Sequence, residues 1–282
     1  GTRSSIVLSG AEMQCATERR LDSACHVPHF VGMVSFVADT IFYAIGDVHG
    51  VADRLQILHD RIFAHHRSAF SDRHMTLIHL GDYVDRGEAS AQVIDMIMEM
   101  ENRASDNPLL DVFSLRGNHE QMMLEAIDGN SSSLDVWLQN GGRATLRSYA
   151  KPDQDPDEVL YKFPLKHKRW LNQLPNVLHD AEKKLVFVHA GVNPLSFPDC
   201  DPQHYIWTRS QRFFDPSRWR ESLDGYVVVH GHTPTRDKLP QFAGNGRRIN
   251  VDSGAVYGGP LSCVILAKGA EPDFLTIPLH EA

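Results

Sequence analysis

The chain has 282 residues, 42% of them hydrophobic, which is enough for one large buried core or two modest ones. Its formal net charge of −8 at pH 7 argues against a general nucleic-acid-binding protein, which would carry a basic stripe. Four cysteines without a C-x-x-C pair or regular spacing argue against a disulfide framework, and no apolar run suits a membrane-spanning helix. We therefore expect a cytoplasmic monomer that binds neither nucleic acid nor a membrane.

Residues 1–32 lack the features of a folded unit. They begin with Gly-Thr rather than Met, and they mix charged and small residues without periodicity. Glu12, Glu18 and Asp22 interrupt any signal-peptide core. We expect this segment to be poorly ordered or peripheral, either as an N-terminal extension or as residues added ahead of a natural start at Met33. Residues 33–282 are expected to form one domain, since no linker divides them.

The first half of the chain repeats one arrangement three times. Buried strands are predicted at three apolar runs: residues 41–45, 75–80 and 111–115. Each run ends at a polar block that contains glycine. Apolar residues at helical spacing follow, near Leu55, Val93 and Met122, and predict three helices. This order is typical of βαβ units, in which functional side chains collect at the carboxyl ends of the strands.

Residues 129–180 differ in composition, with clusters of serine, glycine, proline and aspartate, and we expect surface helices and loops beside the functional residues. Strands are predicted again in five later runs: residues 185–188, 226–229, 247–251, 261–267 and 274–277. The sequence Gly244-Asn-Gly suits the turn of a hairpin. The elements together predict an α/β fold in which two mixed β-sheets pack as a sandwich with flanking helices.

Five short blocks carry the polar residues that suit metal binding. In chain order they are residues 46–50 (GDVHG), 81–87 (GDYVDRG), 117–120 (GNHE), 189–191 (HAG) and 231–232 (GH). They supply carboxylates, imidazoles and one amide but no thiolate, which is a ligand set for Mn²⁺, Fe or Zn²⁺. Taken singly, an aspartate after a strand is more often a helix cap, and a lone histidine is more often packed in the core. Their ordered recurrence at predicted strand ends favours a shared metal site.

The first two blocks suggest two metal ions and an anionic substrate. Asp47 and His49 lie two residues apart, so in an extended segment both side chains face one ion. Asp82 has two carboxylate oxygens and can bridge ions about 3.5–4 Å apart, an arrangement that activates water for attack on phosphorus. Arg86 presents a planar fork of donors that matches phosphate oxygens. Asp85 either orients a histidine or forms an ordinary surface ion pair with Arg86.

The remaining blocks complete the ligand set. Asn118 offers a neutral oxygen, with a helix cap as its alternative role. His119 lies beside it and is free to act as a general acid, because histidine side chains ordinarily titrate near neutrality. His189 and His232 follow predicted strands, and each can supply an imidazole. The residues therefore predict a two-metal phosphoesterase.

The ordered set GDxHG, GDxxDRG, GNHE, HAG and GH resembles the phosphoprotein-phosphatase branch of the calcineurin-like metallophosphoesterase superfamily, over about residues 40–270. Four runs are particularly similar to bacterial and phage Ser/Thr phosphatases: Leu115-Arg-Gly-Asn-His-Glu-Gln-Met-Met, Asn140-Gly-Gly, Gly231-His-Thr-Pro and Val251-Asp-Ser-Gly-Ala-Val. The resemblance implies that residues 33–282 form a metallophosphoesterase catalytic domain with four layers, α/β/β/α. It also implies a serine/threonine protein phosphatase that hydrolyses phosphate monoesters with water activated by a dinuclear metal centre.

The resemblance also assigns roles to ten residues. Two divalent metal ions, Mn²⁺ in the first instance with Fe or Zn²⁺ as alternatives, are implied to be held by Asp47, His49, Asp82, Asn118, His189 and His232. Asp82 bridges the two ions in this assignment. The proton and the phosphate are implied to be handled by His119, Asp85, Arg86 and Arg209, where His119 protonates the leaving oxygen, Asp85 holds His119, and the arginines clamp the phosphate.

The sequence does not distinguish between a phosphorylated protein and a small phosphate ester as the substrate. A related branch, the symmetrical dinucleoside-tetraphosphate hydrolases, often carries Ala at the position of Asp85 and Asp at the position of Glu120. This chain keeps Asp85 and Glu120, which favours the phosphomonoesterase side. A catalytically silent metal-binding scaffold is the third hypothesis, and it predicts that a ligand or the acid is lost. None of them is lost here.

Overall fold

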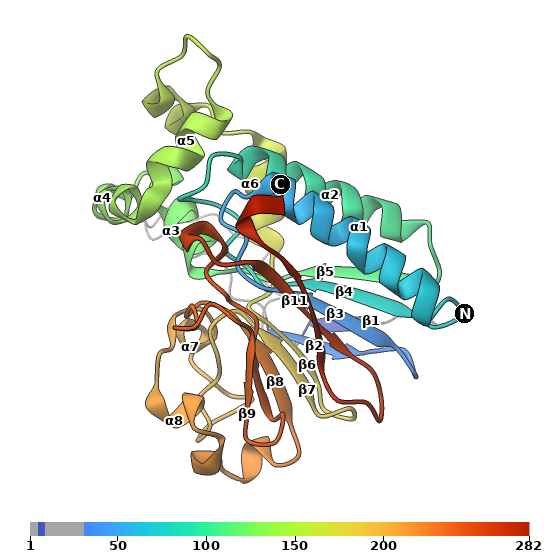
Figure 1. The fold of residues 1–282 in the computed structure, drawn as a ribbon. Helices are drawn as coiled ribbons and strands as arrows, with labels where there is room; N and C mark the ends of the chain where they lie inside the picture. Colours follow the sequence, from blue (N-terminus) through green and yellow to red (C-terminus); the bar gives the residue numbers. More distant parts are fainter. Residues whose placement is uncertain (1–4, 9–30, 282) are drawn as a thin grey trace, which may run out of the picture.

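The computed structural model describes residues 5–8 and 31–281, and their strands form two mixed β-sheets that pack face to face between helices (Figure 1). The predicted α/β sandwich with flanking helices is therefore confirmed. Residues 1–4, 9–30 and 282 lie outside the described residues, and with them most of the segment that was expected to be poorly ordered or peripheral.

The five-stranded sheet has the order β12-β11-β3-β4-β5. Its strands are β3 (Ile41–Ile45), β4 (Met75–His79), β5 (Leu110–Ser114), β11 (Leu261–Leu266) and β12 (Asp273–Ile277). β3, β4 and β5 run parallel, and β11 and β12 add an antiparallel edge. Helices α1 (Ala52–Ala69) and α2 (Ser90–Ser105) lie on the outer face (Figure 1). Every residue of β3 and β4 is buried, as expected for strands covered on both faces.

The seven-stranded sheet has the order β1-β2-β6-β7-β8-β10-β9. Its strands are β1 (Ser5–Leu8), β2 (Val31–Ser35), β6 (Val177–Asp180), β7 (Leu185–Val188), β8 (Val227–His230), β9 (Gln241–Ala243) and β10 (Arg248–Asn250). β9 and β10 form the predicted hairpin, in which Gly244, Asn245 and Gly246 all have positive φ. Helices α7 (Pro202–Trp207) and α8 (Gln211–Phe214) lie beside this sheet (Figure 1).

The other helical elements connect the strands along the chain, except for the last, which follows β12. They are α3 (Asn118–Ile127), α4 (Ser131–Trp137), a π-helical turn (Leu138–Gly142), α5 (Arg143–Tyr149), α6 (Leu165–Gln173) and short 3₁₀ turns at Pro156–Tyr161, Pro216–Arg218, Glu221–Leu223, Ala255–Tyr257 and Leu279–Glu281. The segment 131–149, from α4 through α5, stands out as a lobe at the upper left of Figure 1.

All eight predicted strands are present, and none of their ends is shifted by more than one residue. The expectation for residues 129–180 is wrong at its end, because β6 is a buried strand of the seven-stranded sheet. Its four residues, Val-Leu-His-Asp, are too few for alternation to be recognised, and pairing with β7 decides their conformation. β1, β2 and β9 were not predicted either, and β1, which lies within the segment 1–32, pairs antiparallel with β2 at residues 32–35.

Aromatic side chains fill the layer between the two sheets. Phe36 packs edge-on against Phe42 and Phe187, at ring-centroid distances of 4.8 and 5.9 Å. Val229 and Ile249 complete this layer from the seven-stranded sheet. Burying each large apolar side chain contributes about 1.5–3 kcal/mol, so this layer sets how the two sheets align.

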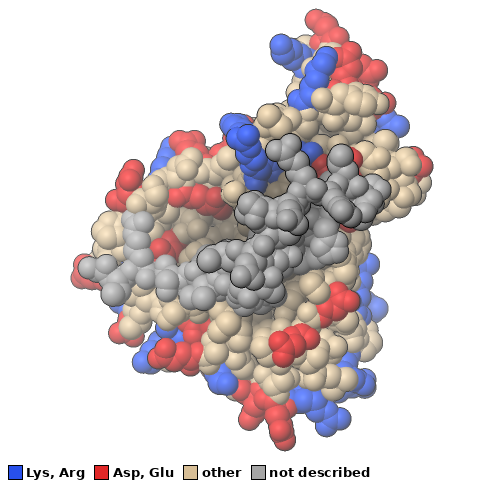
Figure 2. Space-filling model, turned by 180° about the vertical axis from the view of Figure 1, so that it is seen from behind, with Lys and Arg blue, Asp and Glu red and all other residues tan. Residues whose placement is uncertain are grey.

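Two further observations concern the surface charge and the length of the helices. On the face shown in Figure 2, acidic and basic side chains are interspersed over the described residues, without a basic stripe. Within residues 31–281, no helix combines the length and the apolar character needed to cross a membrane.

Candidate active site

All five polar blocks meet at one rim of the sandwich. Three follow β3, β4 and β5 of one sheet, and two follow β7 and β8 of the other. Because these strands point their carboxyl ends toward the same rim, residues far apart in the sequence come together there. Five non-glycine residues of the blocks have positive φ: His49, Asp82, Asp85, Arg86 and His232. Such backbone is costly and concentrates at functional sites.

The rim contains a cavity of about 170 Å³. It is lined by Asp82, Arg86, Asn118, His119, Asn140, Trp207, Arg209 and His232. Six of these were predicted as site residues, and Asn140 and Trp207 were not. A larger cavity of about 720 Å³ lies at the opposite ends of the strands, is lined by loop residues such as Asp39 and Lys268, and contains no predicted site residue.

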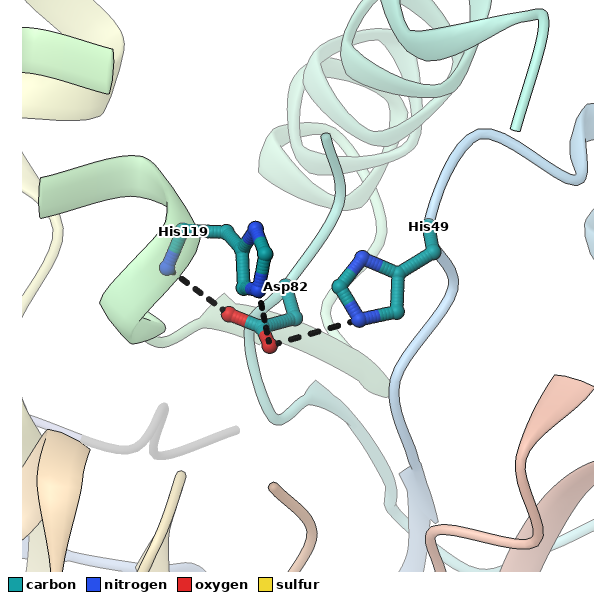
Figure 3. A group of neighbouring side chains, drawn as sticks. All are labelled: His49, Asp82 and His119. Atoms are coloured by element: carbon teal, nitrogen blue, oxygen red, sulfur yellow. Dashed lines mark hydrogen bonds and ion pairs between the residues drawn. The ribbon is translucent and has the colours of Figure 1, made fainter. Parts of the chain in front are cut away.

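Asp82 is the centre of the cluster, and Figure 3 shows it between His49 and His119. Its Oδ2 lies 3.5 Å from His49 Nε2 and 4.0 Å from His119 Nε2. Its Oδ1 accepts a hydrogen bond from the backbone N–H of His119 at 3.1 Å and lies 3.3 Å from His189 Nε2. Burial would raise the pKa of Asp82, but the surrounding histidines hold it well below its usual value. One ionised carboxylate therefore faces His49 and His119 with one oxygen and His189 with the other.

Two groups of potential ligand atoms share Asp82. They are His49, Asp82 and His119, and Asp82, His189 and His232, with the ligand atoms of each group within 4.8 Å of one another. Among the described residues, His232 Nε2 is buried without a hydrogen-bond partner. A buried orphaned nitrogen among carboxylate and imidazole ligands, without thiolate, fits a divalent metal ion.

Backbone carbonyls fix the orientation of two imidazoles. His49 Nδ1 lies 2.8 Å from the carbonyl oxygen of Val84, and His189 Nδ1 lies 3.0 Å from that of Leu80. A carbonyl oxygen only accepts, so Nδ1 carries a hydrogen in both rings and Nε2 is the nitrogen that faces the cluster. Burial lowers the pKa of His49 to about 3, which keeps that ring neutral and able to bind a metal. Burial acts against the pKa of His189, but Asp82 and other carboxylates raise it to about 9.

Asn118 and Asp47 connect the loops of the two sheets. Asn118 Oδ1 lies 3.0 Å from His189 Nε2 and 2.9 Å from His232 Nδ1. The Asp47 carboxylate accepts the backbone N–H of His232, at 3.0 Å for Oδ1. Asn118 is the first residue of α3, while Gly117 occupies the cap position. The alternative role of Asn118 as a helix cap is therefore not observed.

Two glycines of the blocks make room for carboxylates. A Cβ at Gly117 would lie 2.2 Å from Asp82 Oδ1, and a Cβ at Gly231 would lie 2.2 Å from Asp47 Oδ1. Neither contact is sterically possible, so only glycine fits at these positions.

His119 and Asp85 form a buried pair, with His119 Nδ1 2.6 Å from Asp85 Oδ2. The alternative of a surface ion pair between Asp85 and Arg86 is excluded, because the Asp85 side chain is fully buried. Arg86 instead reaches His49 Nε2 and lies with its guanidinium carbon 5.3 Å from the centre of the Tyr257 ring. Arg209 lines the cavity together with Arg86, so two guanidinium groups border it.

Three residues that support the site, Glu120, Trp137 and Thr145, were not predicted as site residues. Glu120 accepts the backbone N–H groups of Asp82, Tyr83 and Gly117, each at 2.8 Å, and so holds the turn that carries Asp82. It belongs to the GNHE block, so the motif could have found it. Trp137 and Thr145 contact Asp85 from the segment 131–149, where only surface helices and loops were expected.

The fold and the site define a metal-dependent phosphoesterase. Residues 41–265 match the sequence model of the calcineurin-like phosphoesterases, and the chain belongs to that family. The family uses a dinuclear metal centre, and the two ligand groups around Asp82 agree with it.

Relatives of this chain are named after two different activities, dinucleoside-tetraphosphate hydrolysis and protein dephosphorylation. The chain is 26% identical over 253 residues to the asymmetrical bis(5'-nucleosyl)-tetraphosphatase PrpE of Halalkalibacterium halodurans, covering 85% of this chain and 94% of the relative. It is 24% identical over 232 residues to serine/threonine-protein phosphatase 2 of Escherichia coli K12, covering 78% and 90%. A serine/threonine phosphatase structure from Saccharomyces cerevisiae has the same fold, with a TM-score of 0.57, 17% identity, and coverage of 86% and 81%.

Proposed function

We propose that this phosphoesterase hydrolyses phosphate monoesters as a serine/threonine protein phosphatase of the bacterial type. One observation carries the proposal: the His119–Asp85 pair is intact, at 2.6 Å, beside a cavity bordered by Arg86 and Arg209. A seryl or threonyl alkoxide is a poor leaving group, so its departure needs a proton donor at this position.

The proposal assigns the metal ions to the rim cluster. Asp47 and His49 would hold one ion, Asn118, His189 and His232 would hold the other, and Asp82 would contribute to both. When bound, the two ions, Mn²⁺ in this proposal, supply Lewis-acid stabilisation and lower the pKa of a water molecule. Asp82 supports this arrangement because its two oxygens face His49 and His189 separately.

The protein's own groups bind the phosphate and move the proton. Arg86 and Arg209 offer planar forks of N–H donors to phosphate oxygens on the cavity wall. His119 Nε2 faces the cluster and gives its proton to the leaving oxygen. The Asp85 carboxylate at Nδ1 stabilises the positive charge that His119 carries before this transfer.

A second candidate function is hydrolysis of dinucleoside tetraphosphates. The relatives named PrpE favour it, and their names specify asymmetrical cleavage rather than the symmetrical cleavage weighed from the sequence. A nucleotide leaving group is already a stable anion, so this reaction needs the proton of His119 much less than ester hydrolysis does.

One substrate panel separates the two functions. We expect the Mn²⁺-loaded enzyme to have a higher kcat/KM on a phosphoserine peptide than on diadenosine tetraphosphate, and a chelator to abolish both activities. A preference for the dinucleotide of about tenfold or more, which is about 1.4 kcal/mol in transition-state stabilisation, would contradict the proposal. The products then identify the cleavage, since AMP with ATP marks the asymmetrical reaction and two ADP the symmetrical one.

A further inference from the structure

The segment 131–149 reaches the acid pair from outside both sheets. It contains two residues without exposed surface, Trp137 at the end of α4 and Thr145 in α5. Both contact the carboxylate of Asp85, which belongs to the loop after β4. The segment 131–149, which supplies no predicted metal ligand, therefore contacts Asp85, the hydrogen-bond partner of His119.

Three donors surround the Asp85 carboxylate. Trp137 Nε1 lies 2.9 Å from Oδ1 and 3.0 Å from Oδ2. Thr145 Oγ1 lies 2.7 Å from Oδ1, and His119 Nδ1 lies 2.6 Å from Oδ2. An indole N–H only donates, so the carboxylate accepts from Trp137 across both oxygens. Each oxygen then has one further partner, Thr145 on one side and His119 on the other.

The direction of the Thr145 hydrogen bond follows from its other contacts. The backbone N–H of Asp85 donates to Thr145 Oγ1 at 2.8 Å and to Ser90 Oγ at 3.1 Å. Because a hydroxyl has one hydrogen, Thr145 can accept from that N–H and give its own hydrogen to Asp85 Oδ1. Thr145 therefore holds Asp85 at both its backbone and its carboxylate.

This set of contacts determines how His119 is oriented. With Oδ1 engaged by Thr145 and the plane of the carboxylate fixed by Trp137, Oδ2 points at His119 Nδ1 and accepts its hydrogen. His119 Nε2 is thereby turned toward the cluster, 4.0 Å from Asp82 Oδ2. Burial raises the pKa of the Asp85 carboxyl, and the hydrogen bonds from His119, Thr145 and Trp137 oppose that rise.

The π-helical turn between α4 and α5 places the two residues. Gly142 packs against the indole, where a Cβ would lie 2.6 Å from the Trp137 ring. Gly141 has φ of +109°, and its carbonyl oxygen accepts the backbone N–H of Arg86 at 3.3 Å. Turns of this kind are frequent at functional sites. Here the turn brings the segment 131–149 against Asp85 and Arg86 together.

We propose that Trp137 and Thr145 are positioning residues for proton transfer, which act through Asp85 on the orientation of His119. This inference rests on the proposed function, because it assumes that His119 protonates a leaving group. Neither residue is among those lining the cavity, and neither belongs to the proposed metal ligands. Their effect should therefore depend on how much the substrate needs a proton.

Four single variants test the proposal on the Mn²⁺-loaded enzyme. Thr145→Val removes the hydroxyl at nearly constant volume, Thr145→Ser restores it, and Trp137→Phe removes the indole N–H. Trp170→Phe is the matched control, since Trp170 Nε1 donates to Glu101 Oε2 at 2.7 Å, a Trp–carboxylate pair that does not include Asp85. Substrates are a phosphoserine peptide and p-nitrophenyl phosphate, whose leaving group needs no proton.

We expect Thr145→Val and Trp137→Phe each to lower kcat on the phosphoserine peptide by roughly tenfold or more, the usual effect of losing a hydrogen bond to a charged group. On p-nitrophenyl phosphate the loss should stay within about threefold, because little proton transfer is needed. Thr145→Ser and Trp170→Phe should behave like the wild type on both substrates. Calorimetric Mn²⁺ affinity should be unchanged in all four variants.

A second measurement does not depend on turnover. In the Zn²⁺-loaded enzyme with ¹⁵N-labelled histidine, NMR should show a downfield Nδ1 proton of His119, held in the hydrogen bond to Asp85, in the wild type and in Trp170→Phe. Thr145→Val should shift or broaden this signal, because the carboxylate that accepts the hydrogen bond is no longer held in place. If Trp137→Phe fails to fold, the comparison of Thr145→Val with Thr145→Ser still tests the proposal.

The outcomes that overturn the proposal differ from those that overturn the proposed function. Equal losses on both substrates, or losses accompanied by weaker Mn²⁺ binding, would make Trp137 and Thr145 structural only. An unchanged His119 NMR signal in Thr145→Val would also overturn the proposal. If the wild-type enzyme fails to hydrolyse the phosphoserine peptide, the proposed function fails, and the NMR comparison still tests the positioning of His119.

Discussion

The two sheets contribute chemically different halves of the site. The loops of the five-stranded sheet bring every oxygen ligand of the proposed centre and the acid pair, while those of the seven-stranded sheet bring two imidazoles, His189 and His232. The halves meet through Asp82, 3.3 Å from His189, and through Asp47, which accepts the backbone N–H of His232. A complete site therefore requires the sheets to be packed, and neither sheet alone carries a full ligand set.

The largest effect is expected where the halves meet. Asp82→Asn keeps the size of the side chain but removes the charge that His49 and His189 both face. We expect kcat on any phosphate ester to fall by roughly 10³-fold or more, since metal-ion stabilisation is worth several kcal/mol and each 1.4 kcal/mol is a factor of ten. Isothermal titration should find fewer than two Mn²⁺ per chain.

Asp95→Asn is the control for this variant. Asp95 also lies beside a histidine, 3.1 Å from His167 Nε2, but at a half-exposed position on α2. The Asp95→Asn variant should keep the wild-type kcat and bind two Mn²⁺ per chain. Two tightly bound Mn²⁺ in Asp82→Asn, with kcat within about tenfold of the wild type, would show that the halves do not depend on this carboxylate.

A smaller effect is expected from the acid, which belongs to the five-stranded half alone. His119→Asn should keep both metal ions and lower kcat on a phosphoserine peptide by roughly 10²–10⁴-fold, the usual contribution of a general acid. The loss should be much smaller on p-nitrophenyl phosphate, and kcat on the two substrates measures the difference. Equal losses on both would instead assign His119 to metal binding, as its place in the group with His49 and Asp82 allows.

The smallest effect is expected from imidazoles in the interior of the five-stranded half. His59 on α1 and His79 on β4 are buried with their Nε2 atoms 2.9 Å apart. Burial lowers the pKa of His59 from 6.5 to about 4. Between these values the unfolded chain binds more protons than the folded protein. Stability is therefore full above about pH 6.5 and is lost as the pH falls toward 4, by roughly 3 kcal/mol.

Urea unfolding of the metal-free protein between pH 7 and 4.5 measures this contribution. His59→Gln should show a flatter dependence of the free energy of unfolding on pH than the wild type. Gln203→Ala, at a half-buried position on α7 without a titratable group, should leave the dependence unchanged. If His59→Gln follows the wild-type curve, the buried pair does not contribute to the acid sensitivity of the fold.

The sequence predicted the five-stranded half better than its surroundings. β3 and β4 are continuous apolar runs that end at glycine blocks, so both the strands and the residues after them could be found. β6 could not, because its short polar-containing run becomes a strand only through its partners. The support of Asp85 by Trp137 and Thr145 could not be predicted either, since it joins residues 52 and 60 positions away in sequence.

The position of the lobe 131–149 has a consequence for how such an enzyme can change over time. The proposed metal ligands come from loops of the two sheets, whereas Trp137 and Thr145, two of the three donors around Asp85, come from a helical segment between α3 and α6. Under the proposed mechanism, substitutions in this segment change the preference for poor or good leaving groups while the metal ligands stay in place. An enzyme with this arrangement can shift between ester and anhydride substrates through one lobe alone.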